Sequence, residues 1–385
     1  MSENSRNWSR RSRAAQALGH VDAVTGALIP PVHLTSTYQR DADNAYSRGY
    51  MYGRPDNATV REAEAVVAML EGASAAMVFG SGMSAATSVF QALAPGDHAV
   101  APTVMYWALR AWLAQDARAA GLQVDFVDTS DLDAVRAAVR PGRTKLVWLE
   151  TPSNPLWTIS DIAAVAAIAH EAGARLAVDS TVATPILTRP LEFGADLVMH
   201  SATKYLNGHS DVIAGALVSA RDDDFWRKIV RIRATQGKIL GPFEAFLLIR
   251  GMRTLDLRVR AQCDSALWLA QQFAARDDIS HVLYPGLPEH PGHKLAARQM
   301  RGGFGGMMSI RVAGGAERAI AVAAHVNLWK RATSLGGVES LIEHRGSIEG
   351  PDSPCPNDLL RLSVGLESRE DLAADLFAAL DRAKG

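Results

Sequence analysis

The stretch KLVWLE at residues 145–150 decides the fold of this chain, because it is apolar along most of its length and ends on a carboxylate. Two shorter runs of the same kind occupy residues 176–179 and 197–201 and end on Asp179 and Ser201. Apolar runs without polar alternation are typical of strands buried on both faces of a parallel sheet. Ligands bind at the carboxyl ends of the strands in such sheets, so the polar residues found there are candidates for a functional site.

Further short apolar runs alternate with amphipathic helices on both sides of these strands. They predict strands at residues 77–79, 98–101 and 124–127, and a helix at residues 162–171 that Gly173 closes. Strands separated by helices predict an α/β fold with a doubly wound, mostly parallel sheet.

The first clear helix is expected to begin at Thr59. Thr59 and Glu62 have the spacing of a capping box, and apolar residues follow at helical intervals. Gly72 is expected to end the helix, where a left-handed residue is needed. The first 50 residues, in contrast, are expected to be irregular.

The pattern changes after residue 235. Helical stretches at 243–250 and 255–273 precede a glycine-rich segment at 302–306, interpreted as a turn, a strand at 307–312 and a helix at 369–384. This indicates a second, smaller α+β domain. The expected organisation is an N-terminal arm at residues 1–58, a cofactor domain at 59–235 and a C-terminal domain at 236–385.

Composition excludes several classes of protein. The 385 residues include 48% hydrophobic and 21% charged side chains with a net charge of −1, so neither nucleic acid nor an acidic membrane is an expected partner. No apolar run approaches the roughly 20 residues of a membrane span. The two cysteines, Cys263 and Cys355, lie outside any CxxC pattern, so we expect no disulfide framework and no metal site. Two isolated cysteines of this kind suit a protein of the reducing cytoplasm. The arginine-rich residues 1–20 are interpreted as a flexible arm, with a transit peptide as the alternative.

The polar residues at the strand ends form a chemically coherent set. A glycine turn or a lone lysine has an ordinary structural explanation, but together these residues supply what pyridoxal 5′-phosphate (PLP) requires. The set comprises an amine, a carboxylate for the ring nitrogen, an aromatic face for stacking, and a phosphate site with a helix N-terminus. In that order, the candidates are Lys204, Asp179, Tyr106, and Ser81, Gly82 and Met83 with Ser201 and Thr203.

Further motifs follow in order along the chain. They are YGR at 52–54 before Asn57, SGM at 81–83, ETPSNP at 150–155, VD at 178–179, SATKY at 201–205, RGMRTL at 250–255, SLGGVES at 334–340 and RLSVGLE at 361–367. With these motifs the chain resembles the Cys/Met-metabolism, or trans-sulfuration, family of PLP enzymes over nearly all of its length after residue 30.

The resemblance implies a fold and a role for each matching residue. The fold would be PLP fold-type I, like that of aspartate aminotransferase. Lys204 would hold the cofactor as a Schiff base and move protons, with Asp179 on the ring nitrogen and Tyr106 stacked on the ring. Arg361 would clamp the substrate α-carboxylate, for which a guanidinium suits bidentate binding, with Asn154 and Ser334 lining the same pocket. Tyr52 and Arg54 would reach the phosphate of a neighbouring subunit, where Tyr52 would also contact the substrate, within a homo-oligomer that is typically a tetramer.

The chain also departs from the family pattern near the substrate. Trp107 follows the stacking tyrosine where a glycine is usual, and Met51 and Thr333 stand where cystathionine γ-lyases and γ-synthases commonly have glutamate. The segment EHRGS at 343–347 replaces a proline-containing stretch. These changes predict an altered substrate pocket, in which cystathionine is not strongly preferred.

The resemblance implies cleavage of a C–S bond in an amino acid by β- or γ-elimination. The alternative within the family is γ-replacement, which joins an activated homoserine to a nucleophile with the same residues. An aminotransferase and a binding protein that has lost catalysis remain the alternatives outside this class. Survival of Lys204, Asp179, Tyr106 and Arg361 disfavours the last of these.

Overall fold

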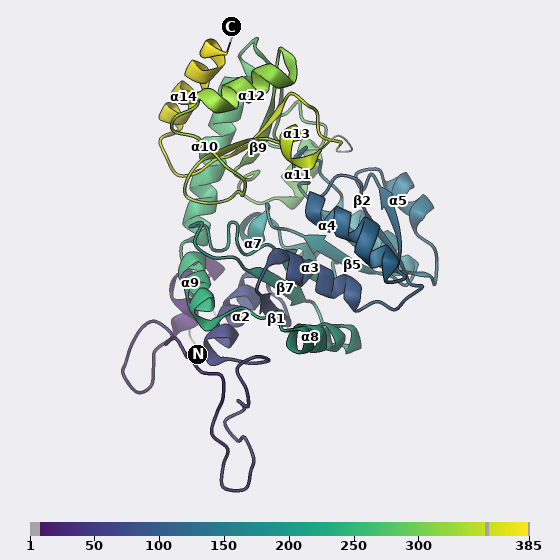
Figure 1. Ribbon diagram of the computed structural model, residues 1–385, viewed down its shortest axis with the longest axis vertical. Helices are drawn as coiled ribbons and strands as arrows, with labels where there is room; N and C mark the ends of the chain where they lie inside the picture. The colour runs from purple at the N-terminus through teal and green to yellow at the C-terminus, as the bar shows by residue number, and fades with distance from the viewer. Residues whose placement is uncertain (1–7, 351–353, 384–385) are drawn as a thin grey trace.

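The fold comprises two sheets, seen one above the other in Figure 1. The structure is a computed structural model and describes residues 8–350 and 354–383. The larger sheet has the strand order β1-β7-β6-β5-β4-β2-β3 and the smaller has the order β10-β11-β12-β9-β8. The larger sheet consists of β1 (Ala75–Phe79), β2 (His98–Pro102), β3 (Gln123–Val127), β4 (Thr144–Glu150), β5 (Arg175–Asp179), β6 (Leu197–His200) and β7 (Gly215–Ser219).

The larger sheet is parallel except at β7, which confirms the predicted mostly parallel sheet. Strands β2 to β6 pair in parallel, whereas β7 pairs antiparallel with both β1 and β6. Sequence analysis located the six other strands but did not identify β7. This strand follows Lys204 after a short loop, without the intervening helix that marks the other crossovers.

Helices cover both faces of the larger sheet, so the sheet is doubly wound as predicted. Successive side chains of a strand point to opposite faces. Accordingly, Trp148 of β4 packs in a cluster with α3 (Gly82–Gln91), α4 (Trp107–Trp112) and α8 (Asp224–Gln236). Its neighbours Val147 and Leu149 pack in another cluster with α5 (Leu132–Ala138) and α6 (Ile162–Glu171).

The start of helix α2 (Ala58–Glu71) corrects the predicted capping box. Asn57 is the N-cap, and its side-chain oxygen accepts a hydrogen bond from the Thr59 amide at 2.9 Å. The Thr59 hydroxyl instead donates to the carbonyl of Pro31 at 3.0 Å and accepts from the amide of His33 at 2.9 Å. Thr59 therefore anchors the preceding arm and is not available to cap the helix. Gly72 ends α2 in the left-handed conformation, as predicted.

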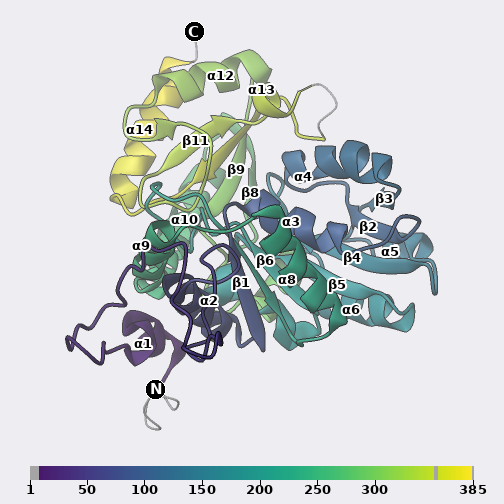
Figure 2. The ribbon, with the colours of Figure 1, turned by 60° about the horizontal axis from the view of Figure 1, so that its bottom comes forward.

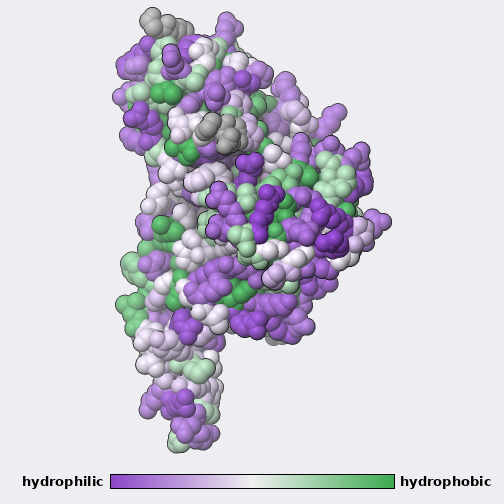
Figure 3. All heavy atoms as spheres, turned by 45° about the vertical axis from the view of Figure 1, so that its right-hand side comes forward, coloured by the Kyte–Doolittle hydropathy of each residue, from purple (hydrophilic) through white to green (hydrophobic). Residues whose placement is uncertain are grey.

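The N-terminal segment contains a helix where irregular structure was expected. Helix α1 (Arg10–Ala15) buries Ala14 against the core beside α2, and Arg10 donates to the carbonyl of Met69 at 3.3 Å. Beyond α1 the chain runs in extended loops that project from the body, as Figures 1 and 2 show. In the space-filling view of Figure 3 the same loops form the narrow extension at the bottom. Several apolar side chains there are exposed, among them Val24 at 93% and Leu34 at 76%.

The smaller sheet consists of β8 (Ile279–Leu283), β9 (Met307–Val312), β10 (Lys330–Arg331), β11 (Leu341–His344) and β12 (Leu359–Ser363). Its core is shared with α10 (Leu255–Ala274), α12 (Gly315–His325) and α14 (Arg369–Arg382). The predicted strand at 307–312 coincides with β9. The predicted C-terminal helix is α14, although its expected last residue, Lys384, lies outside the described residues.

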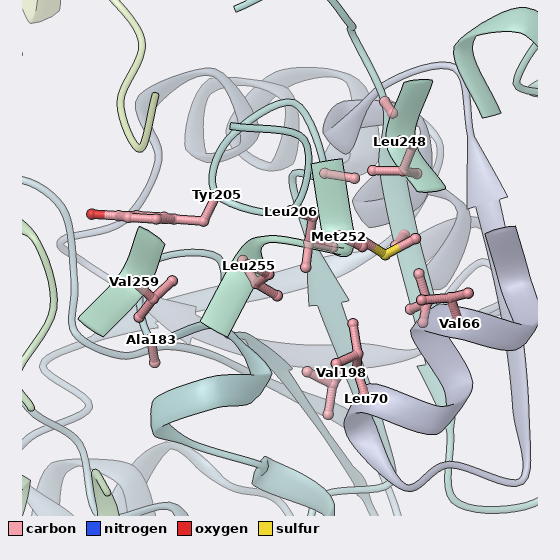
Figure 4. Close-up of a cluster of buried hydrophobic side chains, with 14 of the residues drawn as sticks. Val66, Leu70, Ala183, Val198, Tyr205, Leu206, Leu248, Met252, Leu255 and Val259 are labelled. Atoms are coloured by element: carbon pink, nitrogen blue, oxygen red, sulfur yellow. The ribbon is translucent and has the colours of Figure 1, made fainter. Parts of the chain in front are cut away.

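Helix α9 (Pro242–Met252) packs with the larger sheet. Figure 4 shows Leu248 and Met252 of α9 near Val66 and Leu70 of α2 and Val198 of β6, all members of one buried cluster. The residues directly after position 235 therefore contribute to the core of the larger sheet, and the domain boundary expected there stays a prediction. In the described residues, no helix has the length and apolar character needed to cross a membrane.

Candidate active site

A cavity of about 250 Å³ opens at the carboxyl ends of β4, β5 and β6. Parallel pairing brings these ends to one edge of the sheet, where ligand sites form in such folds. The cavity is lined by most of the residues that sequence analysis selected: Ser81, Gly82, Met83, Tyr106, Asn154, Asp179, Ser201, Thr203 and Lys204.

Lys204 lies in the turn that follows β6, and its amine points to the smaller sheet's side of the cavity. Its Nζ donates a hydrogen bond to Ser334 Oγ at 2.8 Å. Burial, followed by the positive charge of Arg361, lowers the pKa of Lys204 to about 8. Removing a charged amine from water favours its neutral form, so this lysine is a nucleophile or a base at a lower pH than an exposed lysine.

Asp179 ends β5 and is buried at the edge of the cavity. Its Oδ1 accepts from the Thr181 amide at 3.0 Å and from the Thr181 hydroxyl at 2.6 Å. Burial raises the pKa of Asp179, and the two bonds from Thr181 oppose that shift. A cationic partner in the cavity would hold this carboxylate in its ionised form.

Glu150 is a cavity residue to which sequence analysis gave no role. It lies opposite Asp179 in the register of β4 and β5, and accepts from the amides of Tyr106 at 2.7 Å and Asn154 at 2.9 Å. Burial, and then the neighbouring Asp179, raise the pKa of Glu150 to about 8. The sequence showed Glu150 at the end of the same kind of apolar run as Asp179, but that signal alone indicated no role for it. Glu150 fixes the backbone that carries two other cavity residues.

The beginning of α3 forms a cradle for an anion. Ser81 caps the helix by accepting from the Ser84 amide at 3.0 Å, and the first N–H groups of a helix have no partner within it. A side chain at Gly82 would place its Cβ 2.9 Å from Ser201 Oγ, so glycine lets the serine approach the helix. The Thr203 hydroxyl lines the cavity but is also bonded to both backbone groups of Ala214.

Tyr106 lies at the N-terminus of α4 with 40% of its surface exposed. Burial of the remainder raises the pKa of its hydroxyl, so the phenol is neutral near pH 7. The ring of Trp107 lies edge-on to that of Tyr106, with centroids 6.2 Å apart. Trp107 itself lines a neighbouring hollow of about 570 Å³ with residues of α4 and is not part of the lining of the cavity that holds Lys204.

Arg361 enters the site from β12 of the smaller sheet. Its Nη1 donates to Asn154 Oδ1 at 3.3 Å, and its Nη2 donates to the carbonyl of Ser334 at 2.8 Å. Nη2 also lies 2.7 Å from Glu343 Oε2 in an ion pair. Burial lowers the pKa of Arg361 to about 10. The structure thus connects Lys204, Asn154, Ser334 and Arg361 through hydrogen bonds.

Tyr52 and Arg54 lie on the projecting arm. Arg54 donates to the backbone carbonyl of Ala234, and its guanidinium lies 5.8 Å from the centre of the Tyr52 ring. Met51 and Tyr52 are 56% and 45% exposed. In the described residues of this chain, the cavity lining does not include these arm residues. No group of three or more His, Cys, Asp or Glu side chains is arranged for a metal ion within residues 8–350 and 354–383.

Comparison with known proteins places this geometry in a family. Residues 12–381 match the family described as Cys/Met metabolism PLP-dependent enzymes. Cystathionine gamma-synthase from Mycobacterium tuberculosis is 43% identical over 375 residues, covering 96% of each chain. Cystathionine beta-lyase from Coxiella burnetii is 40% identical over 368 residues, covering 93% of this chain and 94% of the relative. The crystal structure of cystathionine gamma synthase from Xanthomonas oryzae with cystathionine has a TM-score of 0.93 and 38% identity, covering 98% of this chain and 99% of that one.

These matches span the chain almost from end to end and agree with the cavity built around Lys204, Asp179 and the start of α3. The chain belongs to the Cys/Met metabolism family of PLP-dependent enzymes.

Proposed function

We propose that this enzyme cleaves a C–S bond in a sulfur amino acid by β- or γ-elimination. The observation that carries the proposal is that a buried guanidinium lies beside the cavity that holds a desolvated amine, where it donates to Asn154 of the cavity lining. Lys204 and Arg361 are joined through Ser334, whose hydroxyl binds the amine and whose carbonyl binds the guanidinium. An amino-acid substrate needs both groups: the amine takes the proton from its Cα, and the guanidinium binds its carboxylate.

The cavity residues fit PLP. The cradle at Ser81 and Gly82 suits its phosphate, Asp179 suits its ring nitrogen and Tyr106 offers an aromatic face. Burial raises the pKa of Asp179, and a protonated ring nitrogen held by this carboxylate would offset that shift. When bound, the cofactor supplies an electron sink that stabilises negative charge at the substrate Cα.

Lys204 is proposed to take the α-proton of the substrate. Its neutral form has a lone pair for that proton, and the lowered pKa makes this form available near pH 8. The hydrogen bond to Ser334 holds Nζ at the side of the cavity from which Arg361 approaches. The C–S bond then breaks and the sulfur leaves as a thiol, with the proton returned from Lys204 or Tyr106.

Arg361 and Asn154 are proposed to orient the substrate through its carboxylate. Nη1 of Arg361 faces the Asn154 amide, which lines the cavity. Asn154 is in turn held by its own backbone N–H bond to Glu150. A fixed carboxylate sets which bond of Cα faces Lys204, and correct orientation contributes a large part of catalysis.

A γ-replacement synthase is the second candidate. It is favoured by the relatives at 43% identity, which are named cystathionine gamma-synthase. Both reactions begin with the same proton transfer, so the residues above serve either one. They differ in whether an activated homoserine and an incoming nucleophile are required.

We further propose a cytoplasmic homotetramer in which Tyr52 and Arg54 complete the phosphate site of a neighbouring subunit. The projecting arm supports this, because it extends from the body and exposes apolar side chains. The division into residues 1–58, 59–235 and 236–385 is part of the same proposal, with the arm as the segment that crosses between subunits.

The lowered pKa of Lys204 predicts how the apoprotein takes up its cofactor. Only the neutral amine attacks the PLP aldehyde, so the uptake rate should rise with pH through about 8 and then level off. If the lysine had its ordinary pKa of 10.5, the uptake rate would still be rising at that pH. Stopped-flow absorbance in the visible range measures this rate. Lys238→Gln is the matched control, because burial also lowers the pKa of Lys238 to about 8 and it lies outside the cavity. A midpoint near 10.5, or one that moves in Lys238→Gln, would be incompatible with a desolvated Lys204.

The proposed reaction predicts products from a sulfur amino acid alone. Holoenzyme incubated with cystathionine, methionine or S-alkyl cysteines should release a thiol, ammonia and a 2-oxo acid, all identifiable by mass spectrometry. Lys204→Ala should reduce turnover by about 10³-fold or more, because it removes the proton-transferring group. Turnover that requires both an acyl-homoserine and a nucleophile would instead identify the synthase.

The same panel tests the altered pocket. Met51 and Thr333 cannot bind the distal ammonium of cystathionine as a glutamate would. The kcat/KM for cystathionine should therefore stay within about tenfold of that for S-alkyl homocysteines, the span of roughly 1.4 kcal/mol. A larger preference for cystathionine would mean that another residue binds that ammonium group.

A shared active site predicts recovery of activity in mixed oligomers. Arg54→Ala would remove the proposed phosphate contact of the arm and Lys204→Ala removes the amine, so each variant alone should be nearly inactive. After subunit exchange, sites that pair an intact arm with an intact Lys204 should form, and activity should return to about a quarter of wild type or less, since only part of the sites are restored. Exchange proven by differently tagged chains, without any recovery, would contradict the shared site.

A further inference from the structure

The carboxylate of Glu343 lies against Arg361 because of strand register. In the antiparallel pair β11 and β12, Glu343 stands directly opposite Arg361. Residues opposite each other share a face of the sheet, with Cβ atoms about 4.5–5.5 Å apart. Glu343 Oε2 lies 2.7 Å from Arg361 Nη2, and both residues are buried. The backbone ladder therefore fixes this carboxylate beside the guanidinium proposed to bind substrate.

Arg345 holds Glu343 in that position. Arg345 is buried, and its Nη1 donates to Glu343 Oε2 at 2.6 Å. Its Nε donates on the other side to Glu349 Oε1 at 3.0 Å, from the short helix α13 (Gly346–Glu349). One oxygen of Glu343 thus lies between two guanidinium groups. Moving Glu343 away from Arg361 would also disturb a buried pair with Arg345, which is unfavourable in a low dielectric.

The ion pair with Glu343 reduces the N–H groups and the positive charge that Arg361 has available for a ligand. Nη2 already donates to the Ser334 carbonyl and faces Glu343, while Nη1 lies toward Asn154 at the cavity. A carboxylate is bound most strongly by two parallel N–H bonds from an unshared guanidinium. Here an incoming carboxylate would share the charge with Glu343 and be repelled by it, because like charges repel strongly where water is excluded.

We propose that Glu343 is a specificity-determining residue that partly neutralises Arg361, so that the site accepts amino acids whose C1 group is an uncharged amide or ester as well as free carboxylates. This inference rests on the proposed function, in which Arg361 faces the C1 group of the substrate. The Asn154 amide and the Nη1 donor of Arg361 both suit a neutral carbonyl oxygen. Neither group requires a full negative charge on its ligand.

The test compares two ligands that have no leaving group. L-Alanine and L-alaninamide differ in the charge at C1, and isothermal titration calorimetry gives the Kd of each for holoenzyme at one pH. Glu343→Gln keeps the shape of the side chain and removes its charge. We expect this variant to lower the Kd of alanine by about 10-fold, as for one hydrogen bond to a charged group. The Kd of alaninamide should stay within about twofold of its wild-type value. The change in the ratio between wild type and variant is the readout, so a difference in amine pKa between the ligands cancels.

Glu64→Gln is the matched control. Glu64 is also paired with a buried arginine, at 2.8 Å from Arg233 Nη1, but Arg233 donates to the carbonyls of Val78 and Pro55, which lie outside the cavity lining, whereas Arg361 donates to Asn154 within it. Glu64→Gln should change neither Kd. Bound-cofactor absorbance and the melting temperature establish that each variant is folded. If Glu343→Gln does not fold, Glu343→Asp retains the charge but withdraws it from Arg361, and should shift the ratio in the same direction by a smaller factor.

Each outcome decides between the alternatives. A purely structural Glu343 would change both Kd values together or neither, and either result would overturn this inference while leaving the proposed function intact. Failure of both ligands to bind the wild-type holoenzyme would contradict the proposed function itself, and this inference with it. A selective gain for alanine supports the role of Glu343.

Discussion

The parallel register of β4, β5 and β6 is the constraint on which the rest of the site depends. It places Glu150 beside Asp179 and brings the turn that carries Ser201 and Lys204 to the same edge. Because this edge is buried, two carboxylates and one amine meet out of bulk water. Burial raises the pKa of both acids and lowers that of Lys204. The chemistry of the cavity thus follows from the backbone pairing, which no single side chain determines.

The smaller sheet completes the site and couples to the larger one through specific bonds. Ser334 binds Lys204 and Arg361 at the same time, and its backbone is in the left-handed region at φ 88°. The indole of Trp157 donates to Ser309 Oγ at 2.9 Å, next to Arg361 in the register of β9 and β12. The carboxylate-binding side of the cavity is therefore positioned by contacts between the sheets. A change at Arg361 of β12 reaches Lys204 through Ser334, and a change at Glu343 of β11 does so through Arg361 and then Ser334.

The sequence predicted the larger sheet well because its strands are apolar runs, which need no knowledge of distant residues. It failed where the outcome depends on long-range contact. The antiparallel β7 has no helix before it, and Thr59 binds the arm instead of capping α2. Residues 10–15 form a helix that buries Ala14 in the same core cluster as residues of α2.

Some residues of the candidate site could likewise be predicted from the local sequence, and others could not. Lys204, Asp179 and Tyr106 could be predicted as a chemical set, whereas the role of Arg361 came from the family resemblance alone. Glu150 was noted only as the carboxylate that ends its strand and received no role, although it lies beside Asp179. The segment at 343–347 was seen only as a departure from the family. That Glu343 lies against Arg361 follows from the pairing of two strands whose register the local sequence does not encode.

The most direct test of the account is the identity of the lysine that holds the cofactor. Borohydride treatment of the holoenzyme fixes PLP covalently to that amine, and peptide mapping by mass spectrometry then locates the added phosphopyridoxyl group. The account predicts modification of Lys204, at the edge formed by β4, β5 and β6. Modification of Lys238, another lysine whose pKa burial lowers to about 8, or of any other lysine in place of Lys204, would contradict it.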